Sequence, residues 1–292
     1  MANSSVASYN SAGNIAPYFV PEPSQWPVRV AVSLLFMTAG AATWVNSGQA
    51  GPFLLACGLL SLVLVLFGWF GNVIREGQNS LHNAQVDRSF RLGMAWFIFT
   101  EVMFFGAMFA ALFYMREISV PDLAHGLSAQ LWQGYSGGWP ASGPGLHSTV
   151  QPMSARGVPA LNTALLLLSG LTITMAHQAM PRGNFRLLIF GLAATVALGL
   201  VFLLMQATEY RHAISELHLT LSQGAYGATF FLLTGFHGVH VAVGVTMVSV
   251  ILVRSLLGQL TPQHHFALDA ISWYWHFVGV VWLLLYIVVY CL

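Results

Sequence analysis

The sequence predicts an all-α integral membrane protein with seven transmembrane helices. Hydrophobic residues make up 57% of the 292 residues and charged residues only 7%, and the mean hydropathy is positive. Soluble globular domains carry about 25% charged residues, so a soluble enzyme is excluded. Seven apolar runs are long enough to cross a hydrocarbon core that requires about 20 helical residues. The net charge of +1 argues against nucleic acid as a partner.

The first two spans are predicted to form an antiparallel hairpin. Residues 28–75 hold two apolar runs, at 28–46 and 51–74, which are joined by a short uncharged connection. A connection of this length forces the second helix to run back along the first. A polar linker at 76–87 follows and separates the hairpin from the rest of the chain.

Residues 88–292 are predicted to hold the other five spans. The third covers 88–115, and the long connection after it, at 116–157, is rich in Gly, Ser and Pro, which is typical of a surface loop. Pro159 fits the first turn of the next helix, where proline is tolerated. The last four spans are predicted at 159–180, 185–210, 224–253 and 266–292.

The arginines predict the orientation of the chain in the membrane, because all ten basic residues are Arg. On the side of the N-terminal segment, 1–27, lie Arg29, Arg75, Arg88, Arg91, Arg182, Arg186 and Arg254; on the other lie Arg116, Arg156 and Arg211. Connections rich in arginine stay in the cytoplasm. We therefore expect a cytoplasmic N-terminus and a C-terminus on the opposite side.

Glu101 is the first candidate functional residue. It lies in the apolar stretch 94–105, ten residues beyond Arg91, which places its carboxyl roughly 15 Å along the helix from the nearest charge. An ionisable group at that depth is costly unless it is paired or neutralised. Two interpretations remain open: a protonated carboxyl bonded to a neighbouring helix, or a group that serves a proton pathway or a lipid cleft.

Three histidines inside predicted spans are the next candidates. His237 and His240 lie three residues apart in the sixth span, and His276 lies in the seventh. Neutral imidazoles on neighbouring helices could ligate a haem or a metal. The favoured interpretation is structural, because histidine also forms hydrogen bonds between transmembrane helices and no carboxylate or thiolate is spaced to complete a site.

Glu209 and the two cysteines receive structural interpretations. Glu209 lies near the predicted end of the fifth span with Arg211 close by, which indicates an interfacial ion pair or a helix cap. Cys57 and Cys291 have no spacing that suggests a disulfide or a metal pair. The sequence thus predicts no metal site.

Several segments, taken together and in order, resemble subunit III of cytochrome c oxidase. They are FIFTEVMFF at 97–105, YGATFFLLTGFHGVH at 226–240 and SWYWHFV at 272–278, with shorter matches at 162–163, 206–210 and 264–266. Any one of these segments alone would be a weak signal. Their combination is specific, and it covers most of the chain from Arg75 onward.

The resemblance implies an accessory subunit without catalytic residues, haem or copper of its own. Family members pack against the catalytic subunit I and the copper-bearing subunit II of a respiratory haem–copper oxidase of the aa3 type. Their first two helices stand apart from the other five, and the cleft between them is filled with phospholipid. The resemblance also implies that the chain supports proton uptake and stability of the catalytic subunit, and that it lies in a bacterial inner membrane with a periplasmic C-terminus.

Individual residues are assigned roles by the same resemblance. The residues implied to bind lipid are Arg75, Arg254, Glu101, Trp69 and Phe70, and those implied to support proton uptake are Glu101, His264 and His265. Guanidinium groups at a cytoplasmic interface suit lipid phosphate.

The chain departs from the family pattern at three places. Gly279 stands where the family commonly has Asp, the segment 141–144 after the Gly-Trp-Pro of the long loop differs from the usual continuation, and Trp69 is a lone tryptophan. These departures put in doubt the polar contact at position 279, the contacts of the long loop and the lipid-facing detail of the second helix.

Two other classes of membrane protein fit the sequence less well. A proton-coupled transporter would use Glu101 and the intramembrane histidines as a relay, but the sequence shows neither broken helices nor repeats. A retinal protein needs a lysine for its Schiff base, and the chain has none. The sequence does not distinguish cytochrome c from a quinol as the electron donor of the complex. It also does not specify whether the complex joins cytochrome bc1 and cytochrome c in a supercomplex.

Overall fold

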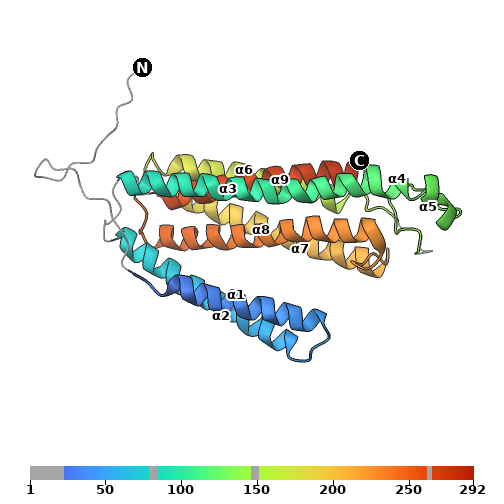
Figure 1. Cartoon of the computed structure of the whole chain (residues 1–292). Coiled ribbons are helices and arrows are strands. Elements are labelled where there is room, and N and C mark those ends of the chain that lie inside the picture. The colour runs from blue at the N-terminus through green and yellow to red at the C-terminus, as the bar shows by residue number, and fades with distance from the viewer. Residues whose placement is uncertain (1–22, 79–83, 146–150, 262–264) are drawn as a thin grey trace, which may run out of the picture. The chain divides into compact units, whose positions relative to one another are not determined.

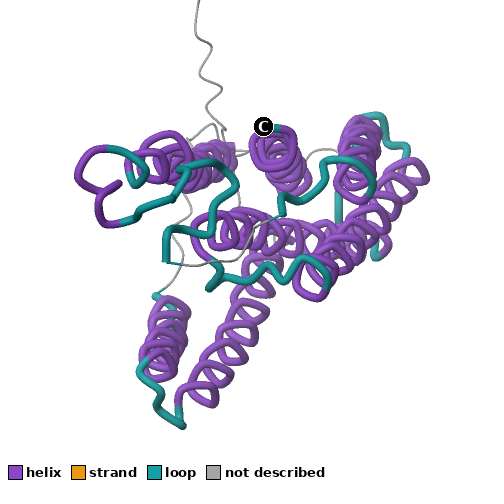
Figure 2. The backbone as a smooth tube through the Cα atoms, turned by 90° about the vertical axis from the view of Figure 1, so that its right-hand side faces the viewer, coloured by secondary structure: helices purple, strands orange, loops and turns teal. Residues whose placement is uncertain are grey.

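The computed structural model describes residues 23–78, 84–145, 151–261 and 265–292, and helices dominate them (Figure 1). Figure 2 shows helices and connecting loops throughout this described part of the chain. The helices, in order, are α1 (Trp26–Val45), α2 (Gly51–Gln78), α3 (Ala84–Phe113), π-helix η1 (Tyr114–Ser119), α4 (Val120–Asp122), α5 (Gly126–Leu131), α6 (Val158–Ala179), α7 (Phe185–Ser215), α8 (Gly224–Leu256), α9 (Phe266–Leu285) and π-helix η2 (Tyr286–Cys291).

Within the described residues, seven helical segments are long and apolar enough to cross a membrane. They confirm the predicted all-α membrane fold with seven spans. The chain forms two compact units, one up to Leu92 and one from Gly93 to Leu292. The first unit contains the α1–α2 hairpin and the start of α3, and the second contains the rest of the bundle. The predicted lipid-filled cleft between hairpin and bundle stays a prediction.

Small residues hold the two helices of the hairpin together. A Cβ added at Gly58 would lie 2.6 Å from the backbone nitrogen of Met37, and one at Gly40 would strike the backbone nitrogen of Leu55. The helices therefore approach so closely that only glycine fits. One side-chain hydrogen bond also crosses the interface, from Ser61 Oγ to Ser33 Oγ at 3.0 Å.

Trp275 of α9 is central to the packing of the second unit. Its side chain is only 1% exposed, and its ring lies against Gly199 of α7 and Gly244 of α8, where an added Cβ would come within 2.8 Å and 2.9 Å of the indole. The indole nitrogen donates a hydrogen bond to Ser169 Oγ of α6 at 3.0 Å. One tryptophan thus joins four helices, because two glycines make room for it.

The third span continues further than the sequence indicates. Its helical segment runs from Gln85 to Asp122 through η1, so the long connection begins later than the predicted residue 116. Arg116 and Glu117 lie inside this helical segment, where they form an ion pair of 3.2 Å. Arg116 also donates a hydrogen bond to the Leu292 carbonyl.

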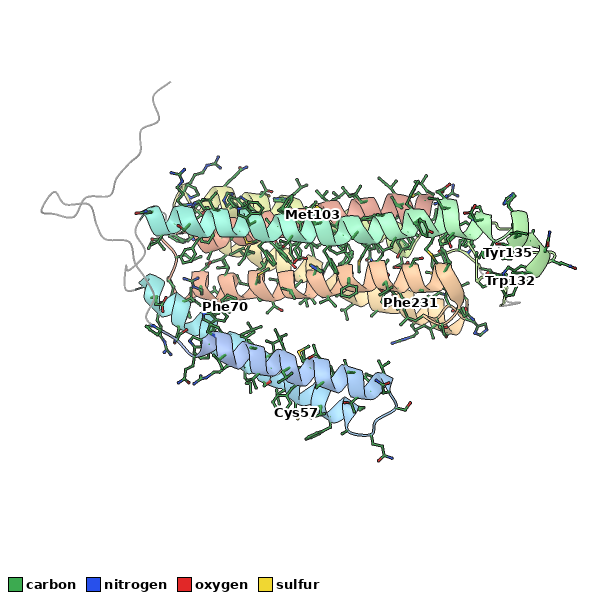
Figure 3. The ribbon with its side chains drawn as sticks, viewed as in Figure 1. Cys57, Phe70, Met103, Trp132, Tyr135 and Phe231 are labelled. Atoms are coloured by element: carbon green, nitrogen blue, oxygen red, sulfur yellow. The ribbon has the colours of Figure 1, made fainter. Side chains whose placement is uncertain are left out.

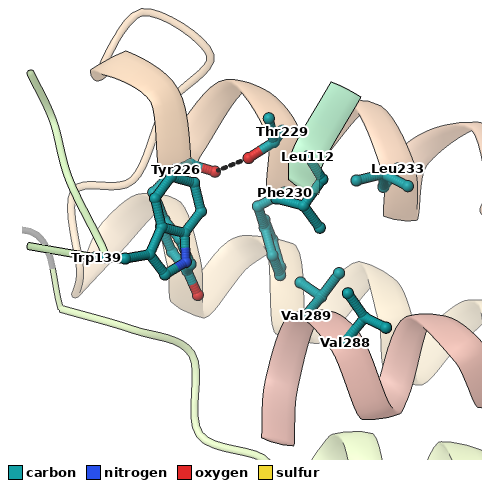
Figure 4. A pocket seen from close by; sticks show the side chains of 8 residues that line it. All are labelled: Leu112, Trp139, Tyr226, Thr229, Phe230, Leu233, Val288 and Val289. Carbon is teal, nitrogen blue, oxygen red and sulfur yellow. Dashed lines mark hydrogen bonds between the residues drawn. The ribbon is translucent and has the colours of Figure 1, made fainter. Parts of the chain in front are cut away.

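The connection that follows packs against the bundle instead of lying free on its surface. The backbone nitrogen of Met153 donates a hydrogen bond to the Tyr226 hydroxyl at 2.9 Å, and the Trp139 ring meets the Tyr226 ring edge to face. A small pocket lies between the connection, α8 and the last helix (Figure 4). Its lining includes Trp139, Tyr226, Phe230 and Val289.

Candidate functional site

Glu101 and His240 form a polar pair about midway along their transmembrane helices. Glu101 lies on α3 and His240 on α8, and the carboxyl Oε2 is 2.9 Å from the imidazole Nε2. The two side chains are only 20% and 15% exposed. The structure thus brings together two residues that the sequence singled out separately.

The hydrogen bonds of His240 define how protons are arranged in this pair. His240 Nδ1 lies 2.7 Å from the Phe236 carbonyl, which can only accept a hydrogen bond, so Nδ1 carries a hydrogen. Nε2 then either accepts the proton of a neutral Glu101 or, as imidazolium, donates one to the carboxylate. In both cases a single proton lies between the two side chains. The pair can therefore hold a proton within the membrane and transfer it over a short distance.

Aromatic and apolar side chains surround the pair. The Phe105 ring meets the His240 ring edge to face with centroids 5.0 Å apart, and the Tyr274 hydroxyl donates a hydrogen bond to the His240 carbonyl at 3.2 Å. The Phe104 ring also lies beside the His240 ring, with centroids 6.1 Å apart. Met103, two residues beyond Glu101, is 59% exposed on another face of α3 (Figure 3). Because this environment is largely apolar, it strengthens the electrostatic interaction of the pair.

The other two intramembrane histidines have partners of their own. His237 is buried, and its Nε2 lies 3.2 Å from the Val278 carbonyl. His276 is exposed on α9, with Nε2 3.1 Å from the Thr174 hydroxyl. Over the described residues, no three His, Cys, Asp or Glu side chains are grouped to hold a metal ion. The structure therefore does not assemble His237, His240 and His276 into one ligand set.

A second polar cluster, which the sequence did not predict, lies where α6 ends and α9 begins. His177 Nε2 is 2.8 Å from Asp269 Oδ1, and His265 Nε2 is 3.7 Å from the same oxygen. The predicted topology could have indicated this cluster. Successive spans cross the membrane in opposite directions, so the end of the fourth span and the start of the seventh lie on the same side. His264, the other histidine assigned to proton uptake, lies outside the described residues.

The residues assigned to lipid binding are divided between the two units. In the first unit Arg75 is exposed in the last turn of α2, with Trp69 partly buried and Phe70 exposed on the same helix (Figure 3). In the second unit Arg254 lies in the last turn of α8, and its Nε is buried without a hydrogen-bond partner. Both arginines therefore lie at helix ends.

The interpretation of Glu209 as an interfacial ion pair or cap is wrong. Its side chain is 2% exposed, and both carboxyl oxygens are buried without a hydrogen-bond partner in the structure. The helix continues beyond it to Ser215, so Glu209 is not at a helix end. Arg211 is two positions away, and residues at that spacing do not face each other on a helix.

Comparison with known proteins agrees with this architecture. The family model described as cytochrome c oxidase subunit III matches residues 16–292. The chain is 40% identical to cytochrome c oxidase subunit 3 of Equus caballus over 274 residues, which cover 94% of this chain and 96% of that protein. The corresponding identities are 39% for Oryctolagus cuniculus and 40% for Pan troglodytes, with the same coverage. This multi-pass membrane chain belongs to the cytochrome c oxidase subunit III family.

Proposed function

We propose that the chain is an accessory transmembrane subunit of an aa3-type cytochrome c oxidase in a bacterial inner membrane. Subunits I and II would hold the haem and copper and reduce oxygen, while this chain binds structural phospholipid and supports proton uptake and stability. The observation that carries the proposal is the family match over residues 16–292. The arginine count supports a cytoplasmic N-terminus and a periplasmic C-terminus.

Support for the proton role comes from the Glu101–His240 pair and from the His177–Asp269 cluster. Both place a carboxyl oxygen within 2.9 Å of an imidazole nitrogen. An imidazole nitrogen can accept or donate a hydrogen bond, so a carboxyl oxygen at this distance can exchange a proton with it. His265 joins the second cluster, near the face that the arginine distribution assigns to the cytoplasm. Protons collected there would pass to the catalytic subunit.

Support for the lipid role comes from the two arginines. A guanidinium group binds phosphate with two parallel hydrogen bonds. At the end of α8, Val250 lies four positions before Arg254 and Leu257 three positions after it, the spacing at which side chains share a helix face. These two side chains are 39% and 65% exposed. Acyl chains could pack on these side chains while the headgroup phosphate pairs with arginine.

A reduced-minus-oxidised absorption spectrum tests the accessory role. The spectrum is recorded on the chain purified in mild detergent with its partners, and again after the partners are stripped away. We expect a haem signal that disappears from the isolated chain. Haem retained by the lone chain would make His237, His240 and His276 ligands and contradict the proposal. No haem in either sample would favour a proton-coupled transporter.

The same absorption spectrum, recorded on a Glu101 variant of the complex, tests whether Glu101 acts on the haem environment. We expect Glu101→Gln to leave the haem spectrum of the complex unchanged, because the partner of Glu101 is His240 and not a redox centre. Loss of the haem bands in a variant that still assembles would show that Glu101 acts on the haem environment and would contradict the assignment.

Replacing both lipid-site arginines should reduce the phospholipid that stays bound. We expect Arg75→Ala with Arg254→Ala to lower the phosphorus content per complex after detergent extraction. The matched control is Arg182→Ala with Arg186→Ala, which removes two exposed arginines from the same predicted side. Equal phospholipid in both double variants would show that Arg75 and Arg254 are not specific lipid ligands.

A further inference from the structure

Four polar side chains meet inside the second unit, away from the Glu101–His240 pair. They are Asn162 of α6, Gln206 and Glu209 of α7, and Tyr290 of η2, with exposed fractions of 0%, 5%, 2% and 7%. One hydrogen bond joins two of them, from Asn162 Nδ2 to Gln206 Oε1 at 3.3 Å. The side chains of Gln206 and Tyr290 also interact with the Glu209 carboxyl.

Most of the hydrogen-bonding capacity of this cluster is unused. The atoms that are buried without a direct partner are Asn162 Oδ1, Gln206 Nε2, Glu209 Oε1, Glu209 Oε2 and Tyr290 Oη. The contacts that Gln206 and Tyr290 make with Glu209 therefore fall short of direct hydrogen-bond geometry. Buried polar atoms are almost always satisfied by protein or by ordered water. So many orphaned atoms in one place indicate that a small polar ligand belongs among them.

The kind of ligand that suits this cluster depends on whether the Glu209 carboxyl is charged or protonated. The titratable groups that act on its carboxyl are His212 and Tyr210 on α7, Tyr226 on α8 and Tyr290 on η2. Only His212 could supply a positive charge, and its Nδ1 lies 3.1 Å from Glu216 instead. A buried carboxylate without a cation is strongly disfavoured. Neutralisation by a proton removes that cost.

We propose that Asn162, Gln206, Glu209 and Tyr290 form an internal site that binds ordered water around a protonated Glu209. A buried water makes about three hydrogen bonds, and this cluster offers both acceptors and donors. Water can accept from Gln206 Nε2 and from the Glu209 hydroxyl, and can donate to Asn162 Oδ1. The Tyr290 hydroxyl can take either role. The site is independent of the lipid and proton-uptake assignments proposed above.

A small pocket lies next to this site. Val288 and Val289, which immediately precede Tyr290, line the pocket beneath the long connection, together with Phe230 (Figure 4). The Phe230 and Tyr290 rings are in contact, with centroids 5.8 Å apart. The pocket therefore borders the polar cluster on the side of Tyr290.

Infrared spectroscopy of the purified full-length protein with its natural partners tests the site. We expect a carbonyl stretching band of a protonated carboxyl that shifts in D2O, disappears in Glu209→Gln and persists in Glu101→Gln. Tyr290→Phe should keep this band but move its frequency, because one hydrogen-bonding group is lost. The O–H stretching bands of bound water, identified by exchange into heavy-oxygen water, should weaken in both variants at the site.

Three results would overturn the proposal. A carboxyl band that survives Glu209→Gln would belong to another residue. A Glu209 signal at the carboxylate frequency, sensitive to replacement of Na+ by K+, would identify a cation site in place of a protonated one. If Glu209→Gln fails to assemble, the more conservative Tyr290→Phe tests the proposed water site. In that variant, an unchanged carboxyl band frequency together with unchanged water bands would exclude bound water beside Tyr290.

Discussion

Truncating Trp275 to alanine is expected to destabilise the second unit by about 3–5 kcal/mol, the range observed when a large buried aromatic side chain is removed. The indole is 1% exposed, packs against two glycines on neighbouring helices and donates to Ser169. Its removal leaves a cavity between helices that cannot close without moving them. The measurement is the thermal unfolding of the chain in detergent, followed by circular dichroism.

Trp96→Ala is the matched control for Trp275→Ala. It removes the same side chain from a site that is 67% exposed, where substitutions usually change stability by about 0.5 kcal/mol or less. Equal loss of stability in the two variants would show that Trp275 is not a central packing residue.

The same packing can be tested from the opposite side by adding one methyl group. A Cβ at Gly244 would lie 2.9 Å from the Trp275 ring, whereas one at Gly238 on the same helix would meet nothing within 4 Å. We therefore expect Gly244→Ala to be destabilising and Gly238→Ala to be neutral or slightly stabilising, because alanine favours helix more than glycine does.

Much of this fold can be predicted from the sequence, because the bilayer imposes a simple rule on length and polarity. The seven apolar runs became seven helices, and the short uncharged turn after the first became a hairpin. The continuation of α3 through Arg116 and Glu117 was not predictable by that rule. These charges neutralise each other across 3.2 Å, which a count of charged residues does not reveal.

The individual residues of the candidate sites could be predicted from the sequence, but the contacts between them could not. Glu101 and His240 stand out separately, because each is a polar residue in an apolar run. Their contact depends on how α3 and α8 are rotated about their own axes, and no local pattern specifies that rotation. Glu209 was misassigned because Arg211, near in sequence, lies on another face of α7. Two other members of its buried polar cluster, Asn162 of α6 and Tyr290 of η2, are far away in the sequence.

The second large effect is expected from separating Glu101 and His240. His240→Leu leaves a carboxyl group in an apolar environment without its partner, which costs about 3–5 kcal/mol for a buried charged pair and about 1–3 kcal/mol for a neutral one. Glu101→Leu similarly leaves Nε2 of the imidazole unpaired. In the double variant both polar groups are gone, so its loss of stability should be smaller than the sum of the two single losses.

A double-mutant cycle on thermal unfolding measures that difference. Residues in direct contact typically show interaction energies of about 0.5–3 kcal/mol, whereas independent residues add. Glu101→Leu combined with His276→Leu is the control, since His276 lies beside Thr174 and should be additive. Additivity of Glu101→Leu and His240→Leu as well would mean that the 2.9 Å contact contributes nothing. The proton held between them would then have no energetic consequence, and the proton-support role would have to depend on the His177–Asp269 cluster alone.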